Sequence, residues 1–222
     1  MKKKIAIIDY KDSNLFSVQN ACNHVGIEPT ITSDAKVIEN SDAAILPGVG
    51  AFRDAMKNLD ELDLIHPIKD FVQSGRPFMG VCLGLQLLFS ESEEFGTCYG
   101  LDLIKGQVRK FPQTKENGEK IKIPQICWNQ IYKRANILQD GDFSPLKDID
   151  DGEFMYFVHS YYVKAENDKY VLTKTNYEGI EYCSSVLYEN IFATQFHPEK
   201  SAEQGIKIYK AWAKTVQTYK RD

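Results

Sequence analysis

The sequence predicts an α/β fold: a doubly wound, largely parallel sheet with a mixed or antiparallel C-terminal part. Three observations support this prediction. From residue 4 to residue 90, short apolar runs alternate with segments of helical periodicity, as in parallel sheets covered by helices. One of these apolar runs stops abruptly at Cys82, between two glycines. After about residue 105 the helical periodicity fades, and β-branched and aromatic residues dominate.

The composition favours a single soluble domain over residues 1–222 with a sizeable core. A net charge of −4 gives no reason to expect nucleic acid or an anionic membrane as a partner. No apolar run reaches the roughly 18 residues of a membrane-spanning helix. The five cysteines are odd in number and irregularly spaced, which argues against a disulfide framework or a zinc site and fits the reducing cytoplasm.

In the first half, strands and helices are expected to alternate. The first helix carries apolar residues at helical spacing from Leu15, and Gly26 is a typical helix end. The last helix of this half is expected after Gly84, in an amphipathic stretch. The expected strands cover residues 4–9, 29–32, 43–46 and 77–81, and the other helices cover residues 52–59 and 64–73.

The second half is expected to continue the same core with strands. Glu189 and Asn190 are typical of a hairpin turn within the last of them. A charged loop is expected at residues 114–122, and a closing amphipathic helix at residues 201–219. The expected strands cover residues 108–111, 125–132, 154–163, 170–175 and 183–196.

Gly80, Cys82 and Gly84 form the pattern G-x-C-x-G, the cysteine form of a nucleophile elbow. A nucleophile on so tight a turn has a strained backbone, and flanking glycines avoid crowding by a Cβ atom. The start of the next helix would favour the thiolate, and the backbone N–H of Leu83 would bind an oxyanion. The alternative interpretation is a buried core cysteine with two packing glycines.

A cysteine nucleophile needs a base, and the base needs an orienting partner. His197 follows an apolar strand, and Glu199 is close enough in the chain to hydrogen-bond its ring and fix the tautomer. The alternative is a capped strand end that leads into a helix. With the elbow, the pattern favours a catalytic triad of Cys82, His197 and Glu199. We expect His24 and His66 to be structural or exposed.

The glycine-rich loop at residues 47–52 follows a predicted parallel strand, so it leaves the sheet at the same edge as Cys82. Its backbone can turn N–H groups toward a bound carbonyl oxygen. An oxyanion hole would then combine Leu83 with Val49 or Gly50. The alternative, a phosphate-binding loop, lacks the lysine and hydroxyl ending of a Walker loop and the G-x-G-x-x-G pattern.

Three motifs together resemble the signatures of class I (triad) glutamine amidotransferases. They are G-V-C-L-G-L-Q at residues 80–86, Q-F-H-P-E-K-S at residues 195–201 and P-G-V-G-A-F at residues 47–52. The resemblance covers nearly the whole chain. The last motif, with F-V-H-S-Y-Y at residues 157–162, is similar to the glutaminase subunits of imidazole glycerol phosphate synthase, which serve histidine biosynthesis.

The resemblance implies that Cys82 attacks the side-chain amide of glutamine to form a glutamyl thioester, which water hydrolyses to glutamate. His197, oriented by Glu199, would activate the thiol and protonate the leaving ammonia. No metal or organic cofactor is implied. The resemblance places the glutamine pocket at Gln86, Glu94, His159, Ser160 and Tyr161.

Two of these residues have alternative interpretations. Glu94 is one of several neighbouring acids that would otherwise be exposed to solvent. For His159, backbone contacts with the substrate are the more plausible contribution, and acid–base chemistry is the alternative.

The resemblance also implies a partner, a (β/α)₈ barrel cyclase subunit bound as a heterodimer. Ammonia would pass directly to this barrel, which makes imidazole glycerol phosphate and AICAR, because ammonia in water would be protonated and lose its nucleophilicity. A rearrangement around Val49 and Gly50 would accompany activation by the liganded partner. The interface is expected at Asn14, Trp128 and Asn129.

Two segments depart from the family pattern. D-Y-K-D-S-N at residues 9–14 lacks two glycines, and P-Q-I-C-W-N at residues 124–129 lacks a histidine and a glycine. Both lie near the partner in the family, so the final ammonia acceptor stays open. The alternative is a paralogous glutaminase that supplies ammonia for amidation of a surface-polysaccharide sugar. A non-catalytic binding module is a third hypothesis, which the complete triad disfavours.

Overall fold

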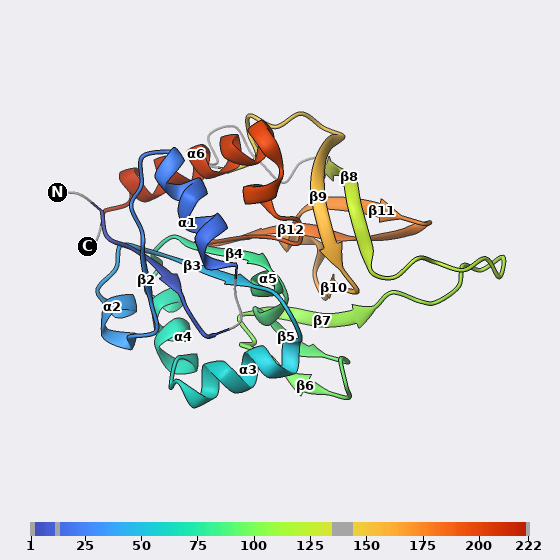
Figure 1. The fold of residues 1–222 in the computed structure, drawn as a ribbon, viewed down its shortest axis with the longest axis horizontal. Coiled ribbons are helices and arrows are strands. Elements are labelled where there is room, and N and C mark those ends of the chain that lie inside the picture. Colours follow the sequence, from blue (N-terminus) through green and yellow to red (C-terminus); the bar gives the residue numbers. More distant parts are fainter. Residues whose placement is uncertain (1–2, 12–13, 135–143, 221–222) are drawn as a thin grey trace.

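The computed structural model describes residues 3–11, 14–134 and 144–220. The first half alternates strands with helices, as predicted (Figure 1). Its strands are β1 (Ile5–Ile8), β2 (Thr30–Thr32), β3 (Ala43–Gly48) and β4 (Phe78–Cys82). Its helices are α1 (Leu15–His24), α2 (Ala35–Glu39), α3 (Phe52–Glu61), α4 (Ile65–Gln73) and α5 (Leu83–Leu87).

The second half is mostly strands and ends in one long helix, α6 (Ala202–Thr218). Short 3₁₀ turns occupy Asp168–Tyr170 and Pro198–Lys200. The strands are β5 (Phe89–Ser92), β6 (Cys98–Tyr99), β7 (Ile104–Lys110), β8 (Gln125–Lys133), β9 (Glu153–His159), β10 (Tyr161–Ala165), β11 (Val171–Tyr177), β12 (Ile180–Tyr188) and β13 (Ile191–Thr194).

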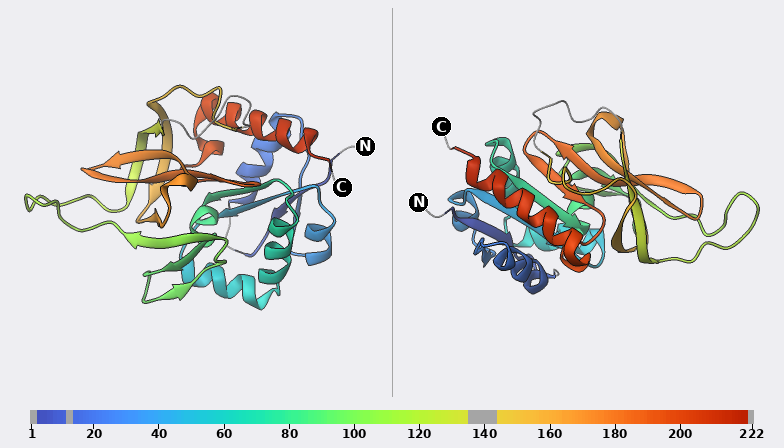
Figure 2. Two further views of the ribbon diagram at one scale, coloured as in Figure 1. Left: turned by 180° about the vertical axis from the view of Figure 1, so that it is seen from behind. Right: turned by 90° about the horizontal axis from the view of Figure 1, so that it is seen from above.

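A parallel sheet in the order β2-β1-β3-β4-β13 forms the centre of the molecule. Alternate residues of β1 enter two separate cores: Ala6 and Ile8 pack with α3 and α4, whereas Ile5 and Ile7 pack with α1 and α6. Figures 1 and 2 show these two helical layers on opposite faces of the strands. The doubly wound arrangement predicted from the sequence is therefore confirmed. Within the described ranges, none of the helices combines the length and apolarity needed to cross a membrane.

The antiparallel part joins this sheet through the β12–β13 hairpin. Its two-residue turn at Glu189 and Asn190 is the predicted one, and Glu189 has a φ of 53°. Strand β12 also pairs with β10 and β11, so two branches of the sheet diverge from it. One branch continues through β7, β5 and β6, and the other through β8 and β9. In the right-hand view of Figure 2 these strands extend away from the helical layers.

The structure differs from the predicted elements at three strands and one helix. The expected strand at residues 154–163 is divided at Ser160 into β9 and β10, which pair with different neighbours, β8 and β7. Helix α2 and strands β5 and β6 were not expected. The predicted loop at residues 114–122 is exposed apart from Lys115, which is half-buried, and Ile121, which is buried; it projects from the body between β7 and β8 (Figure 1).

Helix α5 is only five residues long, and the amphipathic interpretation of this stretch was wrong. Every residue from Leu83 to Phe89 is buried, so there is no polar face to lie against solvent. The chain changes from helix to strand inside the core. A helix this short supplies little macrodipole, so a thiolate at its start depends on other groups for its stabilisation.

Gly84 sets the distance between α5 and β3. A Cβ atom at this position would lie 1.8 Å from the carbonyl oxygen of Leu46. The elbow can therefore press against β3 only because residue 84 has no side chain.

Gly84→Ala should consequently destabilise the protein, by about 2–4 kcal/mol in the free energy of unfolding measured with urea. Gly179→Ala is the matched control, because Gly179 has a φ of +89° but open space around its Cβ position. That control should lose only the roughly 1–2 kcal/mol of a left-handed backbone. Equal losses in the two variants would contradict the tight contact with β3.

Candidate active site

Cys82 is the last residue of β4 and has an unusual backbone conformation, with φ 55° and ψ −108°. A positive φ at a residue with a side chain is strained and needs support from its surroundings. Leu83 begins α5 immediately afterward. The Cys82 side chain lines a cavity of about 320 Å³ at the carboxyl end of the parallel strands. The sharp strand-to-helix turn expected around this cysteine is present.

His197 and Glu199 form a buried pair. The Nδ1 atom of His197 donates a hydrogen bond to Oε1 of Glu199 at 2.7 Å, and their side chains are 1% and 0% exposed. The other ring nitrogen, Nε2, makes no regular hydrogen bond within the described residues, so it is free to exchange a proton with the neighbouring thiol. The short bond to Glu199 fixes the tautomer that this exchange needs.

The electrostatics of the pair favour a charged imidazolium. Burial lowers the pKa of His197, but the Cys82 thiolate and Glu199 outweigh burial and raise it from 6.5 to about 10. A protonated His197 is the counter-ion for a thiolate at Cys82. The charge that stabilises the nucleophile thus comes from this histidine, and not from the short helix α5.

The glycine-rich loop lies beside the elbow because β3 and β4 are neighbours. Gly48 is paired with Cys82, and a Cβ atom at Gly48 would lie 2.1 Å from the Tyr10 hydroxyl oxygen. Val49 and Gly50 follow and line the same cavity, with Gly50 at φ +90°. The backbone at this point can therefore present N–H groups toward the thiol, as an oxyanion hole requires.

The cavity collects every residue expected for the nucleophile, the base, the oxyanion hole and the glutamine pocket. Strands that are distant in the sequence supply them, including β3, β4, β9 and β10. Pro124 and Val158 complete the lining, and Glu199 lies behind His197. The predicted residues that line the cavity are Val49, Gly50, Cys82, Leu83, Gln86, Glu94, His159, Ser160, Tyr161 and His197.

Glu94 faces the cavity, unlike its neighbour Glu93. Its Oε2 atom accepts a hydrogen bond of 2.6 Å from the backbone N–H of Phe52, the first residue of α3. Burial raises the pKa of Glu94, although the bond from Phe52 partly offsets this. Glu93 instead pairs with Arg109 at 2.7 Å on the surface. The geometry favours the pocket interpretation of Glu94 over that of a solvent-exposed acid.

Gln195 was missed by the sequence analysis as a member of the site. It is fully buried, and its Nε2 atom lies 3.7 Å from the Cys82 sulfur as a donor. Its Oε1 atom accepts a 3.0 Å bond from Gln86, which also donates to the Tyr161 carbonyl at 3.0 Å. The available signal was its position two residues before His197, on the same face of an extended chain.

Asn14 and Asn129 turn their amides toward the protein, although both were expected at a partner interface. Asn14 donates to Oε1 of Glu199 at 3.1 Å, and Asn129 donates to the Asn176 carbonyl at 2.9 Å. Trp128, by contrast, is 49% exposed. Of the altered turn at residues 9–14, Asp12 and Ser13 lie outside the described residues.

His159 is held as a neutral ring. Its Nδ1 atom donates to the Tyr161 carbonyl at 2.8 Å, and Nε2 lies 3.2 Å from the Tyr182 hydroxyl. Burial is the main reason that the pKa of His159 falls from 6.5 to about 4. The Tyr182 hydroxyl donates to Oε1 of Gln125, which is itself fully buried. His159 thus supports the pocket wall, and the structure favours this interpretation over acid–base chemistry.

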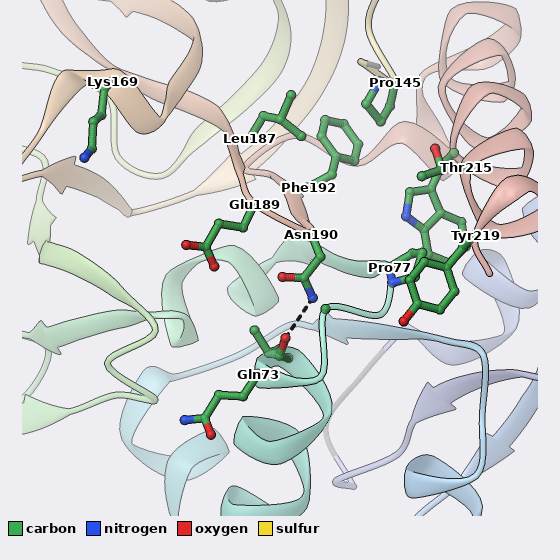
Figure 3. Close-up of a pocket in the computed structure, with 13 residues that line it drawn as sticks. Gln73, Pro77, Pro145, Lys169, Leu187, Glu189, Asn190, Phe192, Thr215 and Tyr219 are labelled. Carbon is green, nitrogen blue, oxygen red and sulfur yellow. Dashed lines mark hydrogen bonds between the residues drawn. The ribbon is translucent and has the colours of Figure 1, made fainter. Parts of the chain in front are cut away.

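A second cavity, of about 650 Å³, lies near the amino ends of β4 and β13 (Figure 3). Asn190 closes part of it by donating to the Val72 carbonyl at 2.9 Å. None of its lining residues is a cysteine or a histidine, so it does not repeat the pair of Cys82 and His197. In the part of the chain that the structure describes, no cluster of three or more His, Cys, Asp or Glu residues could hold a metal ion.

Protonation of His159 should destabilise the fold in acid. Its folded-state pKa of about 4 lies below the ordinary value of 6.5, so its stabilising contribution is full above pH 6.5 and disappears as the pH falls toward 4. The shift corresponds to about 3 kcal/mol. In His159→Gln, the difference in free energy of unfolding between pH 7 and pH 4 should shrink by about that amount. His24→Gln, at an exposed position, is the control; a His159→Gln profile like that of wild type would contradict a neutral buried ring.

Comparison with known proteins agrees with this geometry. The family model described as "Glutamine amidotransferase class-I" matches residues 6–213. The chain is 47% identical over 209 residues to imidazole glycerol phosphate synthase subunit HisH of Syntrophotalea carbinolica, covering 93% of this chain and 97% of the relative. It is 45% identical over 210 residues to the same subunit of Geobacter metallireducens, covering 94% and 97%.

Among solved structures, PurLQS from Thermotoga maritima superposes with a TM-score of 0.71 at 19% identity, covering 97% of this chain and 100% of that one. This likeness concerns the fold alone. The family match, in contrast, extends over nearly all of the sequence that builds the cysteine elbow and the histidine–glutamate pair. The chain belongs to the class I glutamine amidotransferase family.

Proposed function

We propose that this chain is the glutaminase subunit of an imidazole glycerol phosphate synthase. It hydrolyses glutamine to glutamate and ammonia and passes the ammonia to a (β/α)₈ cyclase partner, which makes imidazole glycerol phosphate and AICAR in histidine biosynthesis. One observation carries the chemistry: a single cavity unites the strained Cys82, the buried His197 and the glycine-rich loop. The choice of the histidine pathway rests on the names of the relatives.

In the proposed reaction, His197 already holds the thiol proton as an imidazolium, and the Cys82 thiolate attacks the side-chain carbonyl carbon of glutamine. The backbone N–H of Leu83 and those around Val49 and Gly50 bind the oxyanion. The imidazolium then protonates the leaving nitrogen, ammonia departs and a thioester remains. His197 activates a water that hydrolyses the thioester, which releases glutamate and restores the thiol.

Glutamine is held in this proposal by groups on both sides of the thiol. Glu94 places a carboxylate at the cavity wall, where it would attract the α-ammonium group of the substrate. Gln86 is fixed by Tyr161 and Gln195, so its amide lies in a defined orientation beside the cavity. The backbone at Ser160 and Tyr161, where the chain passes from β9 to β10, forms the opposite wall.

The proposed docking face for the barrel is the outer surface of β8 and β9. Ile126, Trp128 and Phe154 are 56%, 49% and 49% exposed, and they belong to neighbouring pairs of the β8–β9 ladder. Exposed apolar side chains gathered on one surface are typical of a protein interface. Pro124 and Val158 belong to the same segment and line the active-site cavity. Ammonia released at Cys82 would therefore have only a short way to travel to the partner.

The proposal treats residues 1–222 as one glutamine amidotransferase domain, which the continuous sheet through both halves supports. It also places the heterodimer in the cytoplasm, where the five free thiols would remain reduced. The relatives' names favour the histidine pathway over amidation of a polysaccharide sugar.

Glutamate release from glutamine tests the proposal directly. The purified chain should hydrolyse glutamine slowly alone and much faster with the cyclase barrel of the same organism and the barrel's nucleotide ligand. Cys82→Ala and His197→Ala should fold and release no glutamate, because each removes a member of a unit that acts together. Appreciable turnover by Cys82→Ala would falsify the nucleophile. Activity without activation by this barrel would move the acceptor to the polysaccharide pathway.

Trp128→Ala should weaken association with the barrel by at least tenfold in Kd, measured by titration calorimetry, because exposed tryptophans at interface centres contribute strongly to binding. The fold should be unaffected. Tyr99→Ala is the matched control, since Tyr99 is an aromatic residue on β6 that is 75% exposed and lies outside the proposed docking face. Wild-type affinity of Trp128→Ala, or an equal loss in both variants, would count against the docking face.

A further inference from the structure

We infer that Asn14 is a positioning residue of the triad: its amide holds the Glu199 carboxylate in the orientation that orients His197. The effect on kcat that we expect rests on the proposed glutaminase activity. The hydrogen bonds from which the role of Asn14 is inferred do not depend on that proposal. Asn14 and Glu199 are separated by 185 residues in the sequence.

The Glu199 carboxylate has few other partners. Its Oε1 atom accepts two hydrogen bonds, from Nδ1 of His197 at 2.7 Å and from Nδ2 of Asn14 at 3.1 Å. Its Oε2 atom is buried and has no partner in the described ranges. His197 and Glu199 belong to the same short turn and can move together, whereas Asn14 belongs to a different element. The bond from Asn14 therefore ties the carboxylate to the rest of the fold.

The position of Asn14 on its own helix supports this role. Asn14 is the N-cap residue of α1, a place where an asparagine normally accepts a hydrogen bond from the first helical turn. It makes no such side-chain bond. The amide is directed to Glu199 instead, so the side chain serves the triad at the expense of the cap.

Within the described residues, the other titratable groups around Glu199 make no hydrogen bond to its carboxylate. Cys22 of α1 is neutral, because burial raises its pKa to about 12. Tyr209 of α6 is also neutral, because burial raises its pKa, and its hydroxyl has no hydrogen-bond partner within the described residues. His197 is the nearby cation, and Cys82 lies beyond it. Without Asn14, His197 would be the remaining hydrogen-bond partner of the carboxylate among the described residues.

Variants at Asn14 separate positioning from helix capping. Asn14→Ser introduces a residue that caps helices well but is too short to reach Glu199, whereas Asn14→Gln is a poor cap that keeps the amide donor. We expect Asn14→Ser and Asn14→Ala to lower kcat for glutamine about tenfold, with KM within about twofold, in the complex at saturating partner. Asn14→Gln should recover most of kcat. Asn23→Ala, at an exposed position of the same helix, is the control.

A second readout uses the isolated chain and needs neither glutamine nor a partner. The rate of Cys82 alkylation by iodoacetamide is followed against pH. In Asn14→Ser and Asn14→Ala this profile should move about one pH unit higher, because a displaced Glu199 no longer supports the imidazolium that pairs with the thiolate. Asn14→Gln should retain the wild-type profile.

The two readouts distinguish failure of this inference from failure of the proposed function. A wild-type chain without glutaminase activity overturns the proposed function, and the alkylation profiles still decide the role of Asn14. Wild-type kcat and an unshifted profile in Asn14→Ser would overturn the inference. So would an Asn14→Gln variant that behaves no better than Asn14→Ser while Asn14→Ser remains as stable as wild type.

Discussion

The close contact between Gly84 and the Leu46 carbonyl is the constraint on which the site depends. Because the elbow lies directly against β3, the chain must turn within one residue, and Cys82 takes a φ of 55°. The same contact brings Gly48 into register with Cys82 and places the following loop over the thiol. The packing of α5 on β3, together with the pairing of β3 and β4, thus positions the nucleophile and the oxyanion loop, and the backbone strain at Cys82 is balanced by the burial of α5 around it.

The fold must also accommodate the buried carboxylate of Glu199. A carboxylate with an exposure of 0% is costly unless it is paired and hydrogen-bonded. Glu199 meets this need through His197 and Asn14, and His197 in turn pairs with Cys82. The catalytic chemistry and the solvation of a buried acid are therefore served by the same hydrogen bonds.

Local sequence patterns were sufficient for most of the fold. Apolar runs and helical periodicity identified the parallel strands and their helices, and Glu189 with Asn190 identified the hairpin turn. The sequence did not reveal that the predicted strand at residues 154–163 is divided at Ser160. The apolar pattern continues across Ser160, and only the strand that pairs with the chain changes. The length of α5 was misjudged because a wholly buried run has no periodicity to measure. The bonds made by Gln195 and Asn14 join residues more than 100 positions apart, and no local pattern encodes them.

The burial pattern of the altered segment at residues 124–129 separates an internal change from the proposed docking face. Gln125 is fully buried, where it accepts a hydrogen bond from Tyr182, and Tyr182 contacts His159 beneath the pocket. The exchange at this position therefore changes internal packing, which neighbouring side chains can accommodate. Ile126 and Trp128 alternate with it and point outward. The proposed docking face thus keeps its exposed tryptophan, and the departure from the family pattern at Gln125 is confined to the interior.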